Sequence, residues 1–163
     1  ALLDADDILH PRLAAHVAAD NNGRGYLIDK GYIVGAGRLA PLDPAAMPYA
    51  FWDFCGSCAV IAVEPGRQWL PAHYLSRFAS RHHEFANAAR LHGYPLDPVP
   101  FPAALYLFDH GSNASVRHGR SGGKHAYLAA HALPPGEARA VLAEFGVSQA
   151  SITMGDSRLS TIA

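Results

Sequence analysis

The sequence predicts a single mixed α/β (α+β) domain, in which mainly antiparallel strands form a sheet or a β-sandwich flanked by two or three helices. A short apolar, partly β-branched run at residues 59–63 and an apolar run at residues 103–108 are typical of buried strands. Apolar residues recur at helical intervals in residues 75–89 and 135–145. A length of 163 residues is enough for one core, so we expect one domain over residues 1–163.

The composition argues against several functional classes. Hydrophobic residues make up 50% of the chain and charged residues 17%, which indicates a globular protein and not a disordered one. The 13 basic and 14 acidic residues give a net charge of −1, so binding to nucleic acid or to an anionic membrane is not expected. No apolar run approaches the roughly 20 residues that span a bilayer. The only cysteines, Cys55 and Cys58, are too few for a disulfide framework.

The first part of the chain predicts a helix and two strands. Residues 7–19 have apolar side chains at helical intervals, and Pro11 marks a break or a first turn. Residues 26–28 and 32–34 are candidate strands. Three prolines between residues 41 and 48 predict an irregular loop, which leads into the segment with the cysteines.

The middle of the chain predicts a helix, a linker, a strand and a loop. The helix runs from Leu75 to near Gly93, and His82 lies on its apolar face as a core histidine bonded through one ring nitrogen. Residues 97–102 form a rigid linker before the strand at 103–108. The glycine- and serine-rich residues 109–124 read as a long mobile loop and a candidate substrate-facing lid.

The last part of the chain predicts a helix and a closing hairpin. Residues 126–132 are either strand or helix, because their periodicity does not decide between the two. Two prolines at 134–135 begin a helix that ends at Gly146. Residues 147–153 and 159–162 can then pair as a hairpin.

One segment combines a reactive residue type with a specified local geometry. A glycine–serine turn at residues 56–57 brings Cys58 to the start of a buried strand. A turn at residues 64–66 reverses the chain, and residues 69–74 can return as the antiparallel partner. The hairpin therefore carries His73, 73 − 58 = 15 residues later, back toward Cys58. A nearby imidazole can take the thiol proton and produce the thiolate that a cysteine nucleophile requires.

This pattern resembles the catalytic hairpin of the chemoreceptor glutamine deamidases (CheD) and of the cytotoxic necrotizing factor deamidases. The resemblance covers Gly31 to His73 and rests on Gly56-Ser57-Cys58, an apolar strand, a glycine-containing turn and a histidine on the next strand. Upstream, residues 31–37 and Leu39-Ala40 resemble the first strand of CheD-like chains. The sequence departs from CheD at Phe51-Trp52-Asp53, where those chains have a threonine, and it lacks their Gly-Gly-Ala motif, so a receptor-adaptation role is not expected.

The resemblance implies a cysteine-dependent amidohydrolase that deamidates protein glutamine, with transglutamination as a side activity. The implied catalytic residues are Cys58, His73 and Asp53. The implied substrate-binding or oxyanion residues are Gly56, Ser57 and Trp52. The carbonyl of Trp52 is the alternative to Asp53 for orienting the imidazole. No cofactor and no metal are expected.

The resemblance also implies a bacterial toxin or effector domain, excised from the C-terminus of a larger secreted protein. It would be delivered into a target cell and act in the cytoplasm of that cell. The expected partners are a protein substrate in the target cell and a cognate immunity protein in the producing cell, and neither nucleic acid nor a membrane. The start at Ala1, without a signal pattern, agrees with a processed product.

Other functions stay open. The string Cys55-Gly56-Ser57-Cys58 also matches the motif around the nucleophile of papain-like cysteine peptidases, in which the thiol opens a helix. The residues after Cys58 are strand-like and argue against that enzyme class, and against a redox Cys-x-x-Cys pair, which also needs a following helix. Structural zinc would need two further ligands. A non-enzymatic binding module, in which Cys58 is only a buried residue, is the remaining alternative.

Overall fold

The computed structural model of the chain describes residues 7–20, 22–62, 82–91, 93, 95–108 and 122–148. Within these residues the chain is a mixed α/β protein, as the sequence predicts. In chain order the described elements are β1 (Ile8–Leu9), α1 (Arg12–Asp20), β2 (Gly25–Leu27), β3 (Gly31–Gly35), β4 (Arg38–Leu42), α2 (Phe51–Phe54), β5 (Ala59–Ile61), the 3₁₀-helix η1 (His82–Glu84), α4 (Phe85–Leu91), β6 (Asp97–Pro98), β7 (Ala104–Leu107), α6 (Gly122–His131) and α7 (Pro135–Glu144).

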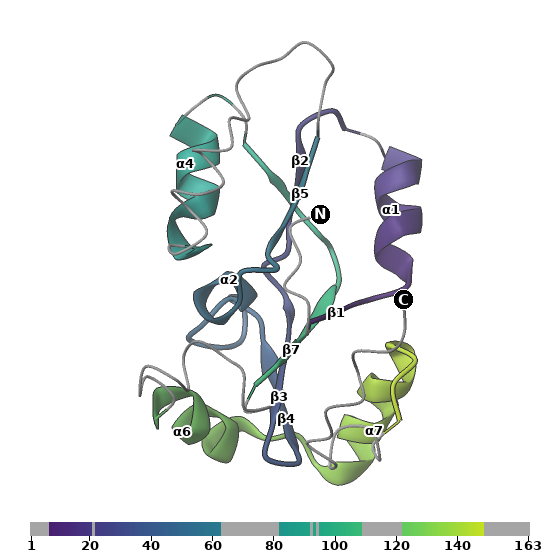
Figure 1. Cartoon of the computed structure of the whole chain (residues 1–163), viewed down its shortest axis with the longest axis vertical. Coiled ribbons are helices and arrows are strands. Elements are labelled where there is room, and N and C mark those ends of the chain that lie inside the picture. The colour runs from purple at the N-terminus through teal and green to yellow at the C-terminus, as the bar shows by residue number, and fades with distance from the viewer. Residues whose placement is uncertain are drawn as a thin grey trace.

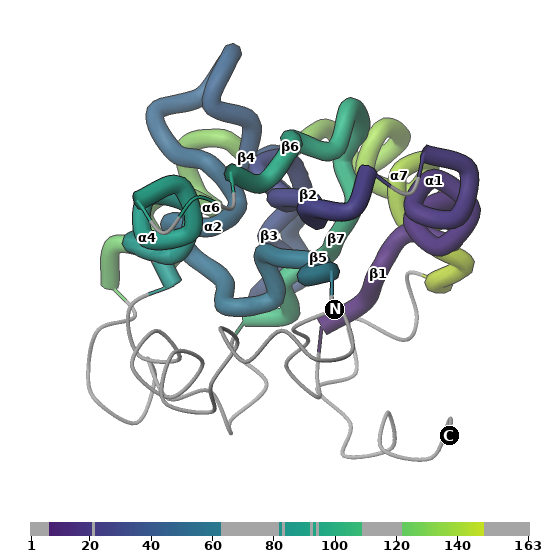
Figure 2. Tube along the Cα trace, turned by 90° about the horizontal axis from the view of Figure 1, so that it is seen from above, coloured from purple at the N-terminus to yellow at the C-terminus, as the bar shows by residue number. Residues whose placement is uncertain are grey.

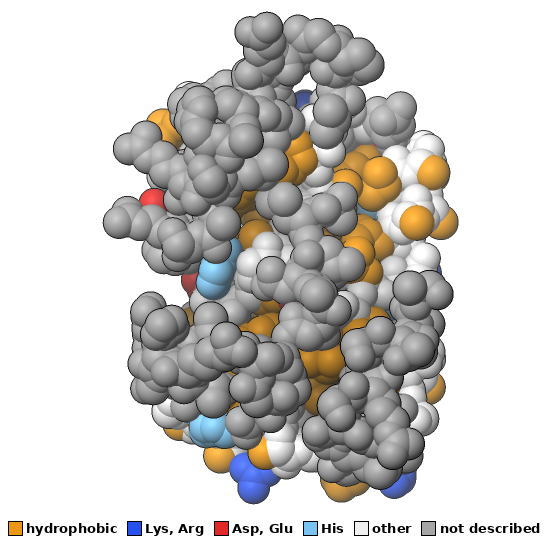
Figure 3. Space-filling view, in the orientation of Figure 1, with side chains coloured by type: hydrophobic (Ala, Val, Ile, Leu, Met, Phe, Trp, Pro, Cys, Tyr) orange, Lys and Arg blue, Asp and Glu red, His pale blue; other side chains and the backbone are white. Residues whose placement is uncertain are grey.

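The elements form three layers. Figure 1 shows the strands in the centre, with α1 and α7 on one side and α2, α4 and α6 on the other, and Figure 2 shows the same division from above. The described part thus contains more helices than the two or three that the sequence predicts. On the face viewed in Figure 3, hydrophobic side chains are visible along the middle of the molecule, over the central strands. No described helix has the length and apolarity that a membrane-spanning helix needs.

The strands form two small mixed sheets. The four-stranded sheet has the order β1-β7-β3-β4, and the three-stranded sheet has the order β5-β2-β6. Of the pairs in the described part, β1–β7, β3–β4 and β2–β5 are antiparallel, whereas β3–β7 and β2–β6 are parallel. The sheets are therefore less antiparallel than the sequence pattern suggests.

Side chains that alternate along the strands of the four-stranded sheet pack into two different hydrophobic cores. Ile33 and Tyr106 face one core, which also contains Phe51 of α2 and side chains from α1 and α6. Val34 and Leu105, the neighbouring positions, face a second core with α7. This alternation is the period of two that a strand imposes on its side chains. The sheet can therefore carry helices on both faces.

Strands β3 and β4 form a tight hairpin that the sequence analysis missed. The two turn residues, Ala36 and Gly37, have φ angles of 49° and 71°, as in the turns that join hairpin strands over two residues. Strand β4 continues through Pro41 to Leu42, so the predicted irregular loop over residues 41–48 begins too early. Proline is tolerated in β4 because β4 is the last strand of its sheet and needs no second partner.

A glycine lets α2 pack directly on the sheet. A Cβ atom at Gly31 would lie 2.4 Å from the ring of Phe51 and 2.5 Å from the carbonyl oxygen of Ala104. Because such contacts are far inside van der Waals distance, residue 31 must be glycine for Phe51 to lie against β3. Phe51 is fully buried, and its N–H donates to the carbonyl of Asp29 at 2.8 Å. These contacts fix α2 immediately before the two cysteines.

Other elements differ from the sequence predictions in their boundaries or type. Residues 8–9 form β1 and not the start of a helix, because they pair with β7, and α1 begins only after Pro11. The predicted linker contains β6, which pairs with β2. Residues 126–131, left open between strand and helix, belong to α6, which begins at Gly122 inside the predicted loop. Helix α7 and strand β7 confirm their predictions.

Several predicted features lie outside the described residues. They are the returning strand at 69–74 with His73, the first part of the 75–93 helix, the loop residues 109–121, and residues 149–163 of the closing hairpin. Residues 147 and 148 are described and are not part of a strand.

A buried histidine caps α1. His10 is 7% exposed, and its Nδ1 accepts the N–H of Arg12 at 3.0 Å. Its ring makes edge-on contacts with Phe101 and Phe145, with centroids 5.6 and 4.8 Å away. Burial, reinforced by the charge of Arg12 and opposed by that of Glu144, lowers the pKa of His10. His10 thus satisfies one of the open N–H groups of the helix only while it is neutral.

The turn between β3 and β4 gives a stability prediction. Ala36 adopts a left-handed conformation that costs L-residues about 1–2 kcal/mol, whereas asparagine tolerates it well. Ala36→Asn should therefore raise the free energy of unfolding by about 0.5–1 kcal/mol in urea titrations. Ala46→Asn is the matched control, because Ala46 is also exposed but has a negative φ. An equal effect of both changes would contradict the explanation.

The cap of α1 gives a prediction of pH dependence. Since the pKa of His10 is lower in the folded protein than in the unfolded chain, the unfolded state binds the extra proton first as pH falls. The contribution of His10 to stability should therefore be complete above about pH 6.5 and decrease below it. Urea unfolding between about pH 5 and 8 should show a flatter dependence in His10→Asn than in the wild type. Identical slopes would contradict the prediction, since the two proteins differ only at residue 10.

Candidate functional site

The predicted nucleophile follows a short helix and a turn. Helix α2 ends at Phe54, residues 55–57 form the turn, and Cys58 stands directly before β5. Strand β5 pairs with β2, with Ala59 opposite Leu27. The chain therefore runs from α2, beside the four-stranded sheet, into the three-stranded sheet. We call residues 55–58 the cysteine turn.

Main-chain hydrogen bonds hold the cysteine turn. The N–H of Cys58 donates to the carbonyl of Gly56 at 2.8 Å, and the carbonyl of Cys58 accepts the N–H of Ile28 at 2.7 Å. The N–H of Ser57 donates to Cys55 Sγ at 3.3 Å. In this conformation the N–H groups of Ser57 and Cys58 both donate within the turn. An oxyanion hole built from them would need these two bonds to open.

The side chains of the cysteine turn meet a buried carboxylate that the sequence analysis did not single out. Asp7 is 8% exposed, and its Oδ2 accepts the thiol of Cys55 at 2.9 Å and the hydroxyl of Ser57 at 2.6 Å. Its Oδ1 accepts the N–H of Leu107 at 3.3 Å. Asp7 precedes β1, and Leu107 ends β7, so the carboxylate joins the cysteine turn to the four-stranded sheet.

The two cysteines have different environments. Burial, followed by the charge of Asp7 and the hydrogen bond to it, raises the pKa of Cys55 well above its usual value. Cys55 is therefore a protonated hydrogen-bond donor and a poor nucleophile. Cys58 is the one cysteine that can serve as the nucleophile, although its side chain is only 1% exposed. A substrate can reach Cys58 only if its surroundings move.

A lysine also supports the site. Lys124, in the first turn of α6, donates to the carbonyl of Phe54 at 3.2 Å and to the hydroxyl of Tyr106 at 2.8 Å. Its ammonium lies 4.4 Å from the centre of the Tyr106 ring. Burial lowers the pKa of Lys124, against the attraction of Cys55 and Asp7. Lys124 thus joins α6 to the C-terminal end of α2, where cations are favoured.

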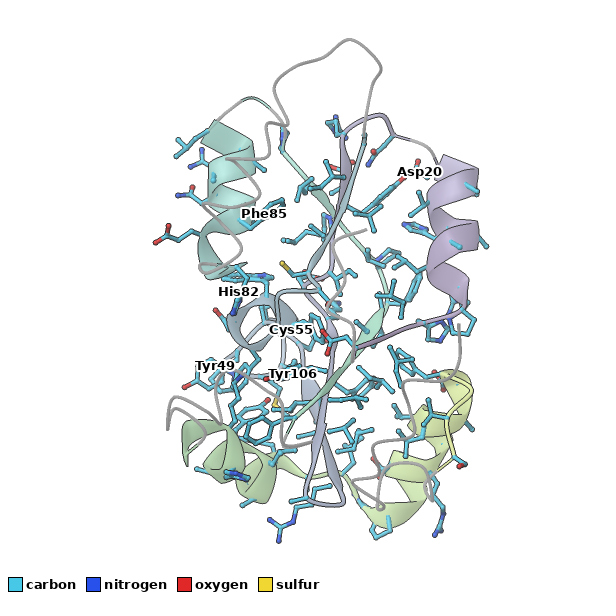
Figure 4. All side chains as sticks on the ribbon, viewed as in Figure 1. Asp20, Tyr49, Cys55, His82, Phe85 and Tyr106 are labelled. Atoms are coloured by element: carbon cyan, nitrogen blue, oxygen red, sulfur yellow. The ribbon has the colours of Figure 1, made fainter. Side chains whose placement is uncertain are left out.

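A histidine in η1 bonds to the main chain of α2. His82 Nδ1 lies 2.6 Å from the carbonyl oxygen of Trp52. Because a carbonyl can only accept, Nδ1 carries the proton, and in the neutral ring the lone pair is on Nε2. Figure 4 shows His82 beside α2, and Cys55 and Tyr106 beside the central strands. His82 does bond through a ring nitrogen, as the sequence predicts, but it is only partly buried and lies in a 3₁₀-helix, so the prediction of a core histidine on a longer α-helix is wrong.

The other predicted site residues have separate positions. Asp53 is exposed, and its Oδ2 accepts the N–H of Ala50 at 2.8 Å, so the carboxylate caps α2. Trp52 is partly buried in the same helix. Gly56 and Ser57 lie next to Cys58 in the cysteine turn. His73 lies outside the described residues. In the described part, no group of three or more His, Cys, Asp and Glu side chains could hold a metal ion.

No protein-family model, curated protein or solved structure matches this chain. The geometry of the cysteine turn is therefore what bears on the function of the chain.

That geometry does not fit two of the alternatives. In papain-like peptidases and in thioredoxin-like redox proteins, the reactive cysteine lies at the N-terminus of a helix, which stabilises the thiolate. Here α2 ends before Cys55, and Cys58 is followed by β5. The helix therefore presents its C-terminal end to Cys55, where a thiolate is disfavoured.

The bond between Cys55 and Asp7 gives a stability prediction. Cys55→Ser keeps a hydrogen-bond donor for Asp7, whereas Cys55→Ala removes it and leaves a buried carboxylate with one donor fewer. Cys55→Ala should therefore lose about 1–3 kcal/mol of unfolding free energy, and Cys55→Ser clearly less. Urea unfolding at pH 7 measures both. Equal stability of the two variants would show that the donor does not matter.

Proposed function

We propose that this chain is a cysteine-dependent amidohydrolase that deamidates glutamine side chains of proteins, with Cys58 as the nucleophile and His73 as the base. The observation that carries the proposal is the place of Cys58. It ends a hydrogen-bonded turn and directly precedes β5, as the predicted hairpin requires, while the thiol of Cys55 is held protonated by its surroundings. We also propose that the chain has a fold like that of CheD and the necrotizing factors.

The proposed reaction has two steps. The thiolate of Cys58 attacks the side-chain carboxamide carbon of a glutamine, and the imidazolium protonates the departing ammonia. The resulting thioester is then hydrolysed by a water molecule that gives its proton to the imidazole, so that glutamine becomes glutamate and the thiol is restored. A primary amine in place of water would give transglutamination.

A main-chain carbonyl is well placed to orient the imidazole. The carbonyl of Trp52 already accepts a hydrogen bond from an imidazole, that of His82, whereas the carboxylate of Asp53 is engaged as a helix cap. Both groups therefore already have one partner, and the carbonyl of Trp52 orients an imidazole in the described part only if His82 is the base. His82 itself becomes the second candidate for the base, because its Nδ1–H bond directs the basic Nε2 away from α2.

The burial of Cys58 favours one other function. A thiol that is 1% exposed is also what a non-enzymatic binding module would contain, with Cys58 as a packing residue. The two functions differ in one property of Cys58, since only the enzyme needs a thiolate near neutral pH. As a toxin or effector, the enzyme would meet its protein substrate in a target cell and its immunity protein in the producing cell.

The thiol itself gives the first test of the enzyme. Alkylation of Cys58 and Cys55 in the full chain, followed separately by mass spectrometry from about pH 5 to 9, should show Cys58 titrating well below the free-thiol value of about 8.5. Cys58→Ser should abolish deamidation of a protein substrate, and Cys55→Ser, the matched control, should keep it. Two cysteines that titrate as ordinary thiols would favour the binding module.

The same titration identifies the base. In His73→Ala the midpoint for Cys58 should return to about 8.5, while His82→Ala should leave it low. The reverse result would make His82 the base and contradict the assignment of His73. An unchanged midpoint in both variants would contradict a Cys–His pair.

A further inference from the structure

Asp7 is a buried acidic group that the proposed reaction does not use. Within the described residues its carboxylate accepts hydrogen bonds from the thiol of Cys55, the hydroxyl of Ser57 and the N–H of Leu107. Such donors offset the cost of burying a carboxylate. Lys124 provides a nearby positive charge, since Asp7 and Cys55 act on its titration.

Two of the side-chain hydrogen bonds of Asp7 are made with Cys55 and Ser57, the residues on either side of Gly56. Cys55 begins the cysteine turn, and Ser57 directly precedes Cys58. Ser57 is fully buried, so its hydroxyl needs a partner within the protein, and Asp7 provides it at 2.6 Å. The backbone of Cys58 is held on its other side by β2, through the N–H of Ile28.

We propose that Asp7 is a positioning residue for the nucleophile: its carboxylate fixes the cysteine turn against the four-stranded sheet and thereby sets where Cys58 stands relative to its imidazole. This role rests on the proposed function of Cys58. Asp7 belongs to the segment before β1, and its partners in the cysteine turn are 48 and 50 residues away in sequence. The segment before β1 thus contributes to the site through its bonds to the cysteine turn.

The test separates positioning from simple support of the fold. A turn that is merely loosened exposes Cys58, which raises its alkylation rate at every pH and does not raise the midpoint, because solvent stabilises the thiolate. Loss of positioning separates the thiol from its imidazole and moves the midpoint toward about 8.5. The midpoint of the pH profile of Cys58 alkylation, measured on the full chain with iodoacetamide, is therefore the decisive quantity.

Two variants remove the contact in different ways. Ser57→Ala deletes one hydrogen bond without changing any charge. In this variant the midpoint of Cys58 alkylation should rise by about one pH unit. Asp7→Asn also removes a negative charge, which by itself would stabilise the thiolate and lower the midpoint. A higher midpoint of Cys58 alkylation in Asp7→Asn can therefore come only from a cysteine turn that is no longer fixed in position. Asp43→Asn, the same chemical change in a partly exposed loop, is the matched control and should have no effect.

The outcomes are distinct. Rising midpoints in Ser57→Ala and Asp7→Asn support the proposal, and Ser57→Ala decides alone if Asp7→Asn does not fold. Unchanged or lowered midpoints, beside a wild-type Cys58 that titrates well below 8.5, overturn the positioning role and leave the proposed function standing. A wild-type Cys58 that titrates as an ordinary thiol overturns both, because there is then no activated nucleophile to position.

Discussion

The carboxylate of Asp7 is the interaction on which the candidate site depends. An ionised group that is 8% exposed is stable only with several hydrogen-bond donors, and Asp7 draws its donors from two separate parts of the fold, the cysteine turn and β7. Removing any one donor leaves a buried charge less well compensated. The requirement to satisfy this group therefore holds the cysteine turn in one place.

The position of α2 against the sheet depends on two further contacts. Gly31 allows the ring of Phe51 to touch β3, and Lys124 bonds to the last carbonyl of the helix from α6. A four-residue helix has almost no stability of its own, because its nucleation cost exceeds the gain from its few hydrogen bonds. Packing from both ends thus determines where α2 stops and where the cysteine turn begins.

Local patterns in the sequence predicted the elements that carry local signals. The strands near residues 26–28, 32–34 and 103–108 are apolar and β-branched or aromatic, and α7 has proline at its start and glycine after its end. Elements that depend on distant partners were missed: β1 and β6 have only two residues each, and their pairing with β7 and β2 leaves no periodicity. Of the site, the turn and strand at Cys58 were predicted. Asp7 was not, because its partners are about 50 residues away and its own neighbours resemble a helix start.

The two cysteines show why spacing alone is a weak guide to thiol chemistry. Cys55 and Cys58 share one turn and the same burial, yet Cys55 lies against an anion and next to the C-terminal end of α2, and both raise the free energy of a thiolate. Cys58 is directed into β5 by its bond to Ile28 and is separated from α2 by the turn. Burial is the largest cause of the raised pKa of Cys55 and is shared by Cys58, and the carboxylate of Asp7 is a further cause at Cys55. If this segment holds a nucleophile, Cys58 is therefore the better candidate of the two thiols.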